Sequence, residues 1–417
     1  MSWAQLARLV AIDIGPLRRH RDFRLLFAGQ VVSLFGTMIT SVAVPFQIYG
    51  LTHSSLAVGL LGLAELIPIL LFAFLGGALA DAQDRRQMVR ATELALAGMA
   101  ALLAINARLP HPQLWALYTL AAAIAGLDAL QRPSLDAMLP RLVEREELPA
   151  AGSLSSLHYN IGMVAGPATG GLLIAAVGVG GAYLVDVATF AASLLALAAM
   201  GAVPPPSGAE RPSLRRVIEG LRYARGRPEL SGTYGVDMVA MFFGMPTALF
   251  PALAPRYGGP AVLGLLYAAP AVGGLLATVT SGWIGRVHRH GLGVLCAATA
   301  WGLAITLFGL LQSLPAALVC LAFAGGADEI SGLFRMTIWN QTIPDALRGR
   351  LASIELLSYS SGPTLGNVES GLVAARFGVQ TSVLSGGLLC LVGVAALAAL
   401  LPAFRAYDAR AGQGTSG

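Results

Sequence analysis

Long apolar segments separated by short polar ones account for most of the sequence. Each is about as long as a helix that crosses a bilayer, which needs roughly 20 mostly apolar residues. The first half contains six such segments, at 23–50, 57–80, 88–107, 113–132, 153–176 and 180–201. The second half contains six more, at 231–256, 261–285, 292–312, 315–338, 352–376 and 381–402. The pattern predicts an all-α integral membrane protein with twelve transmembrane helices.

A polar stretch between the sixth and seventh segments divides the chain. We predict an N-terminal six-helix bundle at 1–201, a cytoplasmic linker at 202–229 and a C-terminal six-helix bundle at 230–417. The linker carries apolar residues at i, i+3, i+4 and i+7, namely Leu214, Val217, Ile218 and Leu221. This spacing predicts an amphipathic helix on the inner leaflet. Tethering of the two halves is its simplest role, and a regulatory or partner-binding role is the alternative.

The composition agrees with a membrane location. Charged residues make up 12% of the chain, against about a quarter in soluble proteins. The net charge of +5 comes from arginines clustered between the apolar segments, which favours a membrane surface over nucleic acid as partner. The three cysteines lie inside apolar segments and indicate neither a metal site nor a disulfide. No nucleotide-binding loop or catalytic constellation is evident, so we expect no enzyme, cofactor or metal.

The arginines also predict the orientation of the chain. With the N-terminus inside, the outer segments hold only Arg108, Arg256 and Arg376, and the inner segments hold the arginine clusters. Basic residues concentrate on the cytoplasmic side of membrane proteins. We therefore expect a multi-pass protein of the inner (plasma) membrane with both termini in the cytoplasm. Nothing in the sequence requires a second copy, and we expect a monomer.

The two halves resemble each other at a shift of about 200 residues. GLD at 126–128 matches GAD at 326–328, and GPATGG at 166–171 matches GPTLGN at 362–367. Two repeats around a site at the midplane of the membrane form the architecture of many secondary transporters. The repeat predicts two pseudo-symmetric bundles.

Several motifs resemble those of the major facilitator superfamily. GGALADAQDRR at 76–86 resembles the loop signature between helices 2 and 3, with Ala82 and Asp84 departing from it. PDALRGRLAS at 344–353 resembles the loop between helices 10 and 11, and GMVAGPATGG resembles the helix-5 signature of drug:proton antiporters. RDFRLLFAGQVVSLFG at 21–36, among other segments, is similar to the branch that contains bacterial enterobactin exporters. The resemblance implies the major facilitator fold and export by proton antiport with alternating access.

Charged residues at the inner ends of the helices form a candidate cytoplasmic gate. An aspartate at the end of helix 2 can accept hydrogen bonds from a neighbouring helix N-terminus. Arginines that follow it can pair with a carboxylate of helix 4, either Asp128 or Asp136. The predicted gate consists of Asp81, Arg85, Arg86, Asp128, Arg132, Asp328 and Arg335. The alternative is an arginine cluster that only sets the topology, beside solvated acids.

Two acids inside the apolar segments are candidates for proton coupling. Glu65 lies in the second segment, and Asp237 lies in the seventh. Charged side chains are costly within a bilayer, so each is a functional candidate. Burial can bring a carboxyl group to titrate near neutrality, as proton uptake and release require. The alternative for each is a structural hydrogen bond to a neighbouring helix.

Polar and soft apolar residues are expected to line the substrate cavity. An apolar cavity with few polar anchors suits a bulky amphipathic ligand. The lining we predict is Gln30, Ser33, Thr37, Tyr159, Asn160, Met241 and Tyr359. Serine and threonine side chains in helices often bond their own backbone instead.

The glycine-rich segment of helix 5 admits three interpretations: a phosphate loop, a close helix contact or a bend. No strand or lysine accompanies it, which excludes the phosphate loop. Glycines four residues apart share one helix face, and a proline removes a backbone donor. We predict a hinge formed by Gly162, Gly166, Pro167, Gly170 and Gly171, with its helix-11 counterpart at Gly362, Pro363 and Gly366. The superfamily resemblance implies that helix 5 packs against helix 8.

The leading hypothesis is therefore an exporter of small amphipathic molecules, siderophore- or drug-like, driven by proton antiport. An importer or uniporter of a small metabolite on the same fold is the alternative within transport. A sensor or scaffold that does not transport is a further alternative, which predicts that the acids within the membrane are dispensable.

Overall fold

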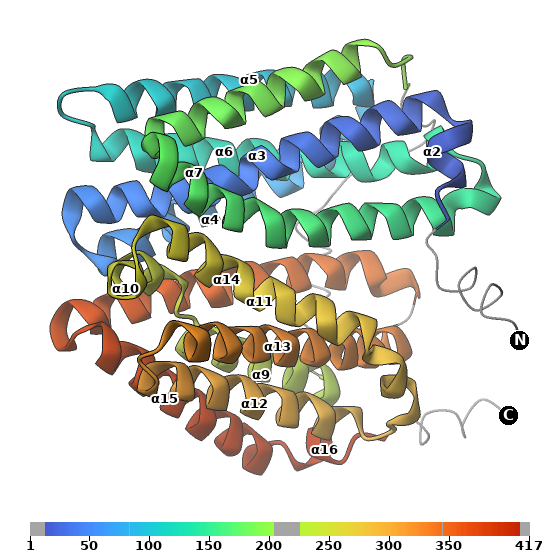
Figure 1. Ribbon diagram of the computed structural model, residues 1–417. Helices are drawn as coiled ribbons and strands as arrows, with labels where there is room; N and C mark the ends of the chain where they lie inside the picture. Colours follow the sequence, from blue (N-terminus) through green and yellow to red (C-terminus); the bar gives the residue numbers. More distant parts are fainter. Residues whose placement is uncertain (1–12, 83, 204–225, 344, 409–417) are drawn as a thin grey trace, which may run out of the picture. The chain divides into compact units, whose positions relative to one another are not determined.

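The structure is a computed structural model that describes residues 13–82, 84–203, 226–343 and 345–408, apart from the side chains of 73–83 and 344–357. Every regular element in this part of the chain is a helix (Figure 1). In the first half these are α2 (Gly15–Arg19), α3 (Arg21–Thr52), α4 (Ser55–Ala82), α5 (Arg85–Arg108), α6 (Leu114–Leu142), the short 3-10 helix η1 (Arg145–Glu147) and α7 (Leu148–Ala198).

The second half repeats this alternation of long helices and short connections. It contains α9 (Pro228–Gly244), η2 (Thr247–Leu249), α10 (Phe250–Tyr257), α11 (Pro260–Val279), η3 (Ser281–Arg286), α12 (His290–Leu310), α13 (Leu314–Thr342), α14 (Asp345–Phe377), α15 (Val379–Leu400) and α16 (Pro402–Arg405). The predicted amphipathic helix of the linker lies outside the described residues.

The described residues contain ten helices long and apolar enough to cross a membrane. One of them, α7, is interrupted at Gly178, whose φ of 72° only glycine adopts readily. It therefore covers both the fifth and the sixth predicted segments. Gly378 has a φ of 90° between α14 and α15, at the same place in the second half. The predicted all-α membrane fold is thus confirmed at the level of helices, and the count of twelve stays a prediction.

The seventh predicted segment, at 231–256, matches a candidate membrane span at Pro228–Tyr257, and this span contains a break. α9 ends at Gly244, Met245 is extended with a ψ of 104°, and η2 begins after Pro246. A residue that precedes proline is pushed away from helical dihedral angles, and proline itself lacks a backbone donor. The Asn367 carboxamide of α14 accepts hydrogen bonds from the Thr247 hydroxyl at 2.7 Å and the Ala248 N–H at 3.0 Å. This side chain thereby satisfies backbone and hydroxyl donors that the break exposes.

Contacts group the chain into two compact units. The first comprises Met1–Ala43 and Pro68–Arg211, and the second comprises Val44–Ile67 and Pro212–Gly417. The end of α3 and the first part of α4 therefore pack with the second unit. The bundle boundaries and the linker at 202–229 stay predictions, because most of that linker is outside the described residues.

Apolar side chains from four helices form a core near one end of the first unit. Leu26 of α3, Val89 of α5 and Met138 of α6 meet Leu197 at the end of α7. Val89 and Met138 have no exposed surface, and Leu197 is 1% exposed. This core fixes the ends of the helices that carry the polar residues of the first unit.

Glycines of α7 pack against α3 within the first unit. A Cβ added to Gly162 would lie 2.7 Å from Leu34, and one added to Gly170 would lie 3.1 Å from the Ile39 Cα. A Cβ at Gly166 would meet the Met38 side chain. Close approach to a neighbouring backbone is the reason for glycine at these positions. Within its own unit this face packs on α3, and the packing of helix 5 against helix 8 that the superfamily resemblance implied stays a prediction.

The glycines of α14 repeat this packing against α9. A Cβ added to Gly362 would lie 3.1 Å from the Met241 Cβ, and Gly366 lies against the Phe242 carbonyl. Sequence alignment of the halves pairs Gly166 with Gly362, and each of these glycines contacts a methionine of the first long helix in its own half. Both helices stay helical through their internal prolines, Pro167 and Pro363. The predicted repeat is therefore visible in the packing of individual residues.

Candidate functional site

An ion cluster joins three helices of the second unit. Arg335 of α13 forms an ion pair with Asp237 of α9, and its second terminal nitrogen lies 3.8 Å from the Asp328 carboxylate. The Ser358 hydroxyl of α14 donates to the other oxygen of Asp237 at 3.4 Å. The side chains of Asp237 and Arg335 are 9% and 13% exposed, whereas that of Asp328 is 42% exposed. One arginine thus faces a buried acid and a more accessible acid.

The local sequence explains why these groups meet. Asp328 and Arg335 are seven residues apart, so they lie on one face of α13, two helical turns from each other. Asp237 is 8% exposed, and Val236 and Ala240 beside it along α9 are also buried. Removing a charge from water is costly unless it is paired, so Asp237 requires the guanidinium. The pairing with Asp237 was not predicted, because it joins helices about 100 residues apart.

A buried arginine between two acids can exchange partners. Protonation of Asp237 removes its negative charge and leaves the guanidinium beside Asp328, a second carboxylate described near it. Loss of that proton restores the attraction to Asp237. Two discrete arrangements that differ by one proton are the physical requirement for a coupled switch.

Glu65 has different surroundings from Asp237. It lies in the first part of α4, which packs on α14: a Cβ on Gly62 would lie 3.4 Å from Thr364, and Gly59 lies against the Asn367 carbonyl. Tyr267 of α11 is close enough to Glu65 for the two side chains to interact electrostatically. Among the described residues no arginine or histidine forms an ion pair with Glu65. A carboxylate without a cation is costly to keep ionised in an apolar environment.

Among the described residues of the first unit, two buried acids accept hydrogen bonds from neutral side chains. Glu93 of α5 has no exposed surface and accepts a hydrogen bond from the Gln30 amide at 2.8 Å. Asp186 of α7 is 2% exposed and accepts from the Thr40 hydroxyl at 2.5 Å and the Thr189 hydroxyl at 3.2 Å. The amide of Gln30, predicted to line the cavity, therefore has a partner inside its own bundle.

The other predicted lining residues differ in their exposure and in their partners. Thr37 and Asn160 bond backbone carbonyls of their own helices, at 3.1 Å and 2.9 Å, and Ser33 is buried. Tyr159 and Tyr359 are each 48% exposed. Met241 is 7% exposed, and it packs on the glycines of α14 described above. Their role in a cavity stays a prediction.

The arginines of the predicted gate bind backbone carbonyls. Arg85 donates to the Ala137 carbonyl at 2.8 Å, and Arg86 donates to the carbonyls of Leu197 and Ala198, each at 2.9 Å. Leu197 and Ala198 lie in the last turn of α7, where the helix dipole places partial negative charge that favours a guanidinium. The expected pairing with Asp128 or Asp136 is not found among the described residues. The side chain of Asp81 lies outside them.

Asp84, which departs from the superfamily loop motif, caps a helix. Its carboxylate accepts from the N–H groups of Arg86 at 2.9 Å and Gln87 at 3.3 Å at the start of α5. An aspartate immediately before a helix is a common N-cap, and this position could have identified it. Asp128 and Arg132 of α6 are both exposed. Arg132 is close enough to interact electrostatically with Asp128 and Asp136.

Comparison with solved structures shows the fold. A POT family transporter in complex with a thioalcohol-conjugated peptide has a TM-score of 0.73 and 14% identity, and covers 92% of this chain and 96% of its own. A mutant of the nucleoside transporter NupG has a TM-score of 0.75 and 11% identity, covering 91% and 98%. A bacterial homologue of the human lysosomal transporter Spinster, inward-facing and unoccupied, has a TM-score of 0.67 and 17% identity, covering 95% and 98%.

Sequence comparison gives more specific relatives. The chain is 31% identical over 393 residues to the enterobactin exporter EntS of Escherichia coli O1:K1 / APEC, covering 94% of each chain. The EntS of Shigella boydii serotype 18 matches with the same identity and coverage. These relatives are transporters, as predicted, and not enzymes. A family model described as transmembrane secretion effector matches residues 12–414. The chain is thus a multi-pass membrane transporter that belongs to the transmembrane secretion effector family of the major facilitator superfamily.

Proposed function

We propose that the chain is a secondary active exporter of small amphipathic molecules, siderophore- or drug-like, that works by alternating access. The similarity to enterobactin exporters over 94% of the chain supports export as the direction of transport and siderophore-like molecules as the substrate class. Met241 of the predicted lining also suits an amphipathic ligand, since Met side chains adapt to irregular shapes.

The orientation and assembly complete this proposal. Twelve spans form two six-helix bundles in the inner membrane, with both termini in the cytoplasm, and the arginine distribution supports this topology. The chain works as a monomer, because alternating access needs only its own two halves. Its partners are the small-molecule substrate, protons and the lipid bilayer.

Export is coupled to protons through the ion cluster of the second unit. The observation that carries this part is the single buried guanidinium of Arg335 between Asp237 and Asp328. A proton from the outer side binds the Asp237 carboxylate, Arg335 turns to Asp328, and the α9–α13 contact loosens. Release of the proton to the inner side restores the ion pair. One proton enters for each cycle in which substrate leaves.

Glu65 is the second proposed coupling acid. The part of α4 that carries Glu65 packs on α14, beside the segment of α14 that bonds the break between α9 and η2. The charge state of Glu65 therefore acts on the contact of α14 with this break. The proposed cytoplasmic gate retains Asp81, Asp128 and Arg132. Arg85 and Arg86 instead hold α5 to the ends of α6 and α7 in both states, since all their described partners lie in the first unit.

Transport in inverted membrane vesicles tests the proposal. In such vesicles the former outer side faces the interior, so an acidic interior should drive accumulation of a labelled catecholate siderophore or a cationic dye. Collapse of the pH gradient with an ionophore should abolish accumulation above the external concentration. Flux that does not depend on the gradient and only equilibrates the substrate would contradict proton antiport and favour a uniporter. An absence of flux for every compound would favour a sensor or scaffold.

A further inference from the structure

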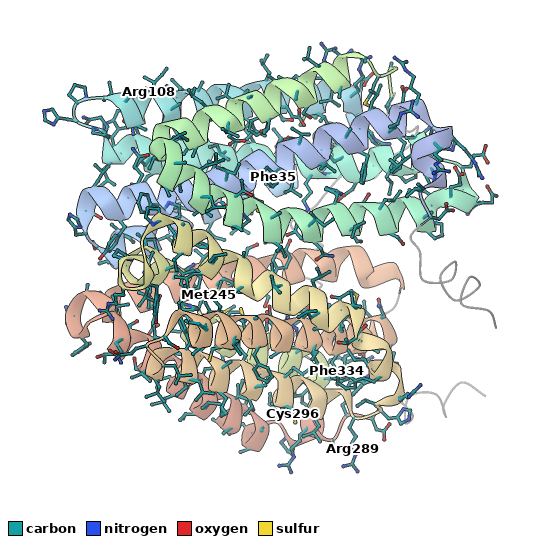
Figure 2. All side chains as sticks on the ribbon, in the orientation of Figure 1. Phe35, Arg108, Met245, Arg289, Cys296 and Phe334 are labelled. Carbon is teal, nitrogen blue, oxygen red and sulfur yellow. The ribbon has the colours of Figure 1, made fainter. Side chains whose placement is uncertain are left out.

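An apolar groove runs along α11, α12 and α13 of the second unit, and no residue of the ion cluster belongs to its lining. It encloses about 880 Å³. Arg289, Cys296 and Phe334, all labelled in Figure 2, are among its lining residues. The only charged residue of the lining is Arg289. A volume of this size is that of a ligand site, which in proteins measures about 300–1,000 Å³.

The groove is deep because its floor consists of small residues. A Cβ on Gly273 of α11 would meet the Ala322 carbonyl of α13, so these two helices are in backbone contact beneath the groove. Large apolar side chains form the rim, and Leu276 and Phe323 are 60% and 61% exposed. Such a surface is stable only where hydrocarbon covers it, and in a membrane protein the lipid supplies that hydrocarbon.

One end of the groove attracts an anion. Arg289 is exposed there and immediately precedes α12, whose first turn has no side-chain N-cap. A helix N-terminus with free N–H groups and an adjacent guanidinium is a favourable environment for a phosphate. Trp283 lies at the same end, and the centroid of its ring is 6.0 Å from that of Phe334. Tryptophan is enriched at the headgroup level of membranes.

The length of the groove agrees with a lipid that stands upright. Its lining on α13 extends from Val319 to Phe334, about 22 Å at roughly 1.5 Å of rise per residue. One leaflet contributes about 15 Å of hydrocarbon, and the headgroup region adds several more. A phosphate at Arg289 therefore places an acyl chain along the small residues of the floor.

We propose that this groove is a binding site for one anionic phospholipid, with its phosphate at Arg289 and the start of α12 and one acyl chain between α11 and α13. Charge complementarity selects an anionic headgroup, because no acid lines the groove to oppose it. The site does not depend on the transported substrate or on the coupling ion.

Fluorescence quenching tests the site directly. The full chain is reconstituted in phosphatidylcholine nanodiscs that contain a small fraction of dibromo-acyl phosphatidylglycerol or, in parallel, dibromo-acyl phosphatidylcholine. The contribution of Trp283 is obtained by subtracting the signal of the Trp283→Phe variant. We expect the anionic lipid to quench Trp283 at about fivefold lower mole fraction, as one basic residue near a membrane surface predicts.

Two pairs of variants distinguish lipid binding in the groove from nonspecific attraction of anionic lipids to the protein surface. Arg289→Gln should abolish the headgroup preference, whereas Arg286→Gln, exposed in the same loop but outside the lining, should retain it. Ala300→Phe should fill the groove and reduce quenching by both lipids, whereas Leu303→Phe, on the exposed face of α12 outside the lining, should not. Equal quenching by the two lipids in the wild-type chain would overturn the proposal. So would a headgroup preference that survives Arg289→Gln.

Discussion

Arg335 forms its ion pair with Asp237, on a different helix, and keeps Asp328, on its own helix, at 3.8 Å. The buried acid therefore holds the guanidinium, and the accessible acid is the alternative partner. Burial explains why Arg335 pairs with Asp237 rather than with Asp328, because an unpaired charge costs most where water is excluded. The exchange of one arginine between two acids is the basis of the coupling we propose.

Neutralisation of the buried acid should uncouple transport. Asp237→Asn keeps the shape of the side chain but cannot change charge, so Arg335 stays with Asp328 throughout the cycle. We expect loss of gradient-driven accumulation in inverted vesicles, with exchange of labelled for unlabelled substrate retained. Glu229→Gln is the matched control, since Glu229 lies on the same helix as Asp237 but pairs with Arg227, at 3.4 Å. Full accumulation in Asp237→Asn would remove this acid from the mechanism.

The same cluster predicts a stability effect that is independent of transport. Arg335→Gln leaves Asp237 buried without a cation, which should lower the stability by about 3 kcal/mol, the lower end for a broken buried ion pair. The double variant Asp237→Asn with Arg335→Gln removes both charges and should recover most of that loss. Thermal unfolding of the purified chain in detergent measures both. If the double variant is as unstable as Arg335→Gln alone, the ion pair is not the cause.

Glu65 should behave differently from Asp237. Because no arginine or histidine of the described chain pairs with it, Glu65→Gln should leave the unfolding temperature unchanged or slightly raised. If Glu65 carries the proton, the variant should also lose its response to an imposed pH gradient. Unchanged stability together with unchanged gradient-driven transport would assign Glu65 a passive role. Vesicle flux and thermal unfolding on the same preparation distinguish these outcomes.

The glycine contacts predict paired effects in the two halves. Gly166→Val and Gly362→Val each insert a branched side chain against a methionine, and so should force α7 from α3 and α14 from α9. Overpacking of this kind costs about 1–3 kcal/mol. We expect membrane insertion at wild-type levels and loss of transport for both. Gly152→Val in α7 has open space around its Cβ and serves as the control. Wild-type transport by either packed variant would argue against a role for these contacts in the cycle.

The helices could be predicted from the sequence because hydrophobic length alone specifies a membrane span. The break at Met245–Pro246 was missed, although the proline signalled it, because the apolar residues continue through it. The partner of Asp237 could not be predicted, since Asp328 is much nearer to Arg335 along the chain. The contact of the α7 glycines with α3 was not predicted for a related reason. Spacing identifies the face that packs, whereas the identity of the packed helix depends on the tertiary fold.

The most direct test of the central claim uses reconstituted vesicles without an imposed pH gradient. A pH-sensitive dye is trapped inside, substrate is added on one side, and the movement of protons is followed as substrate moves down its own gradient. For the wild-type chain we predict proton movement in the direction opposite to that of the substrate, and for Asp237→Asn we predict substrate exchange with no proton movement. Substrate flux through the wild-type chain without any opposing proton movement would contradict the account.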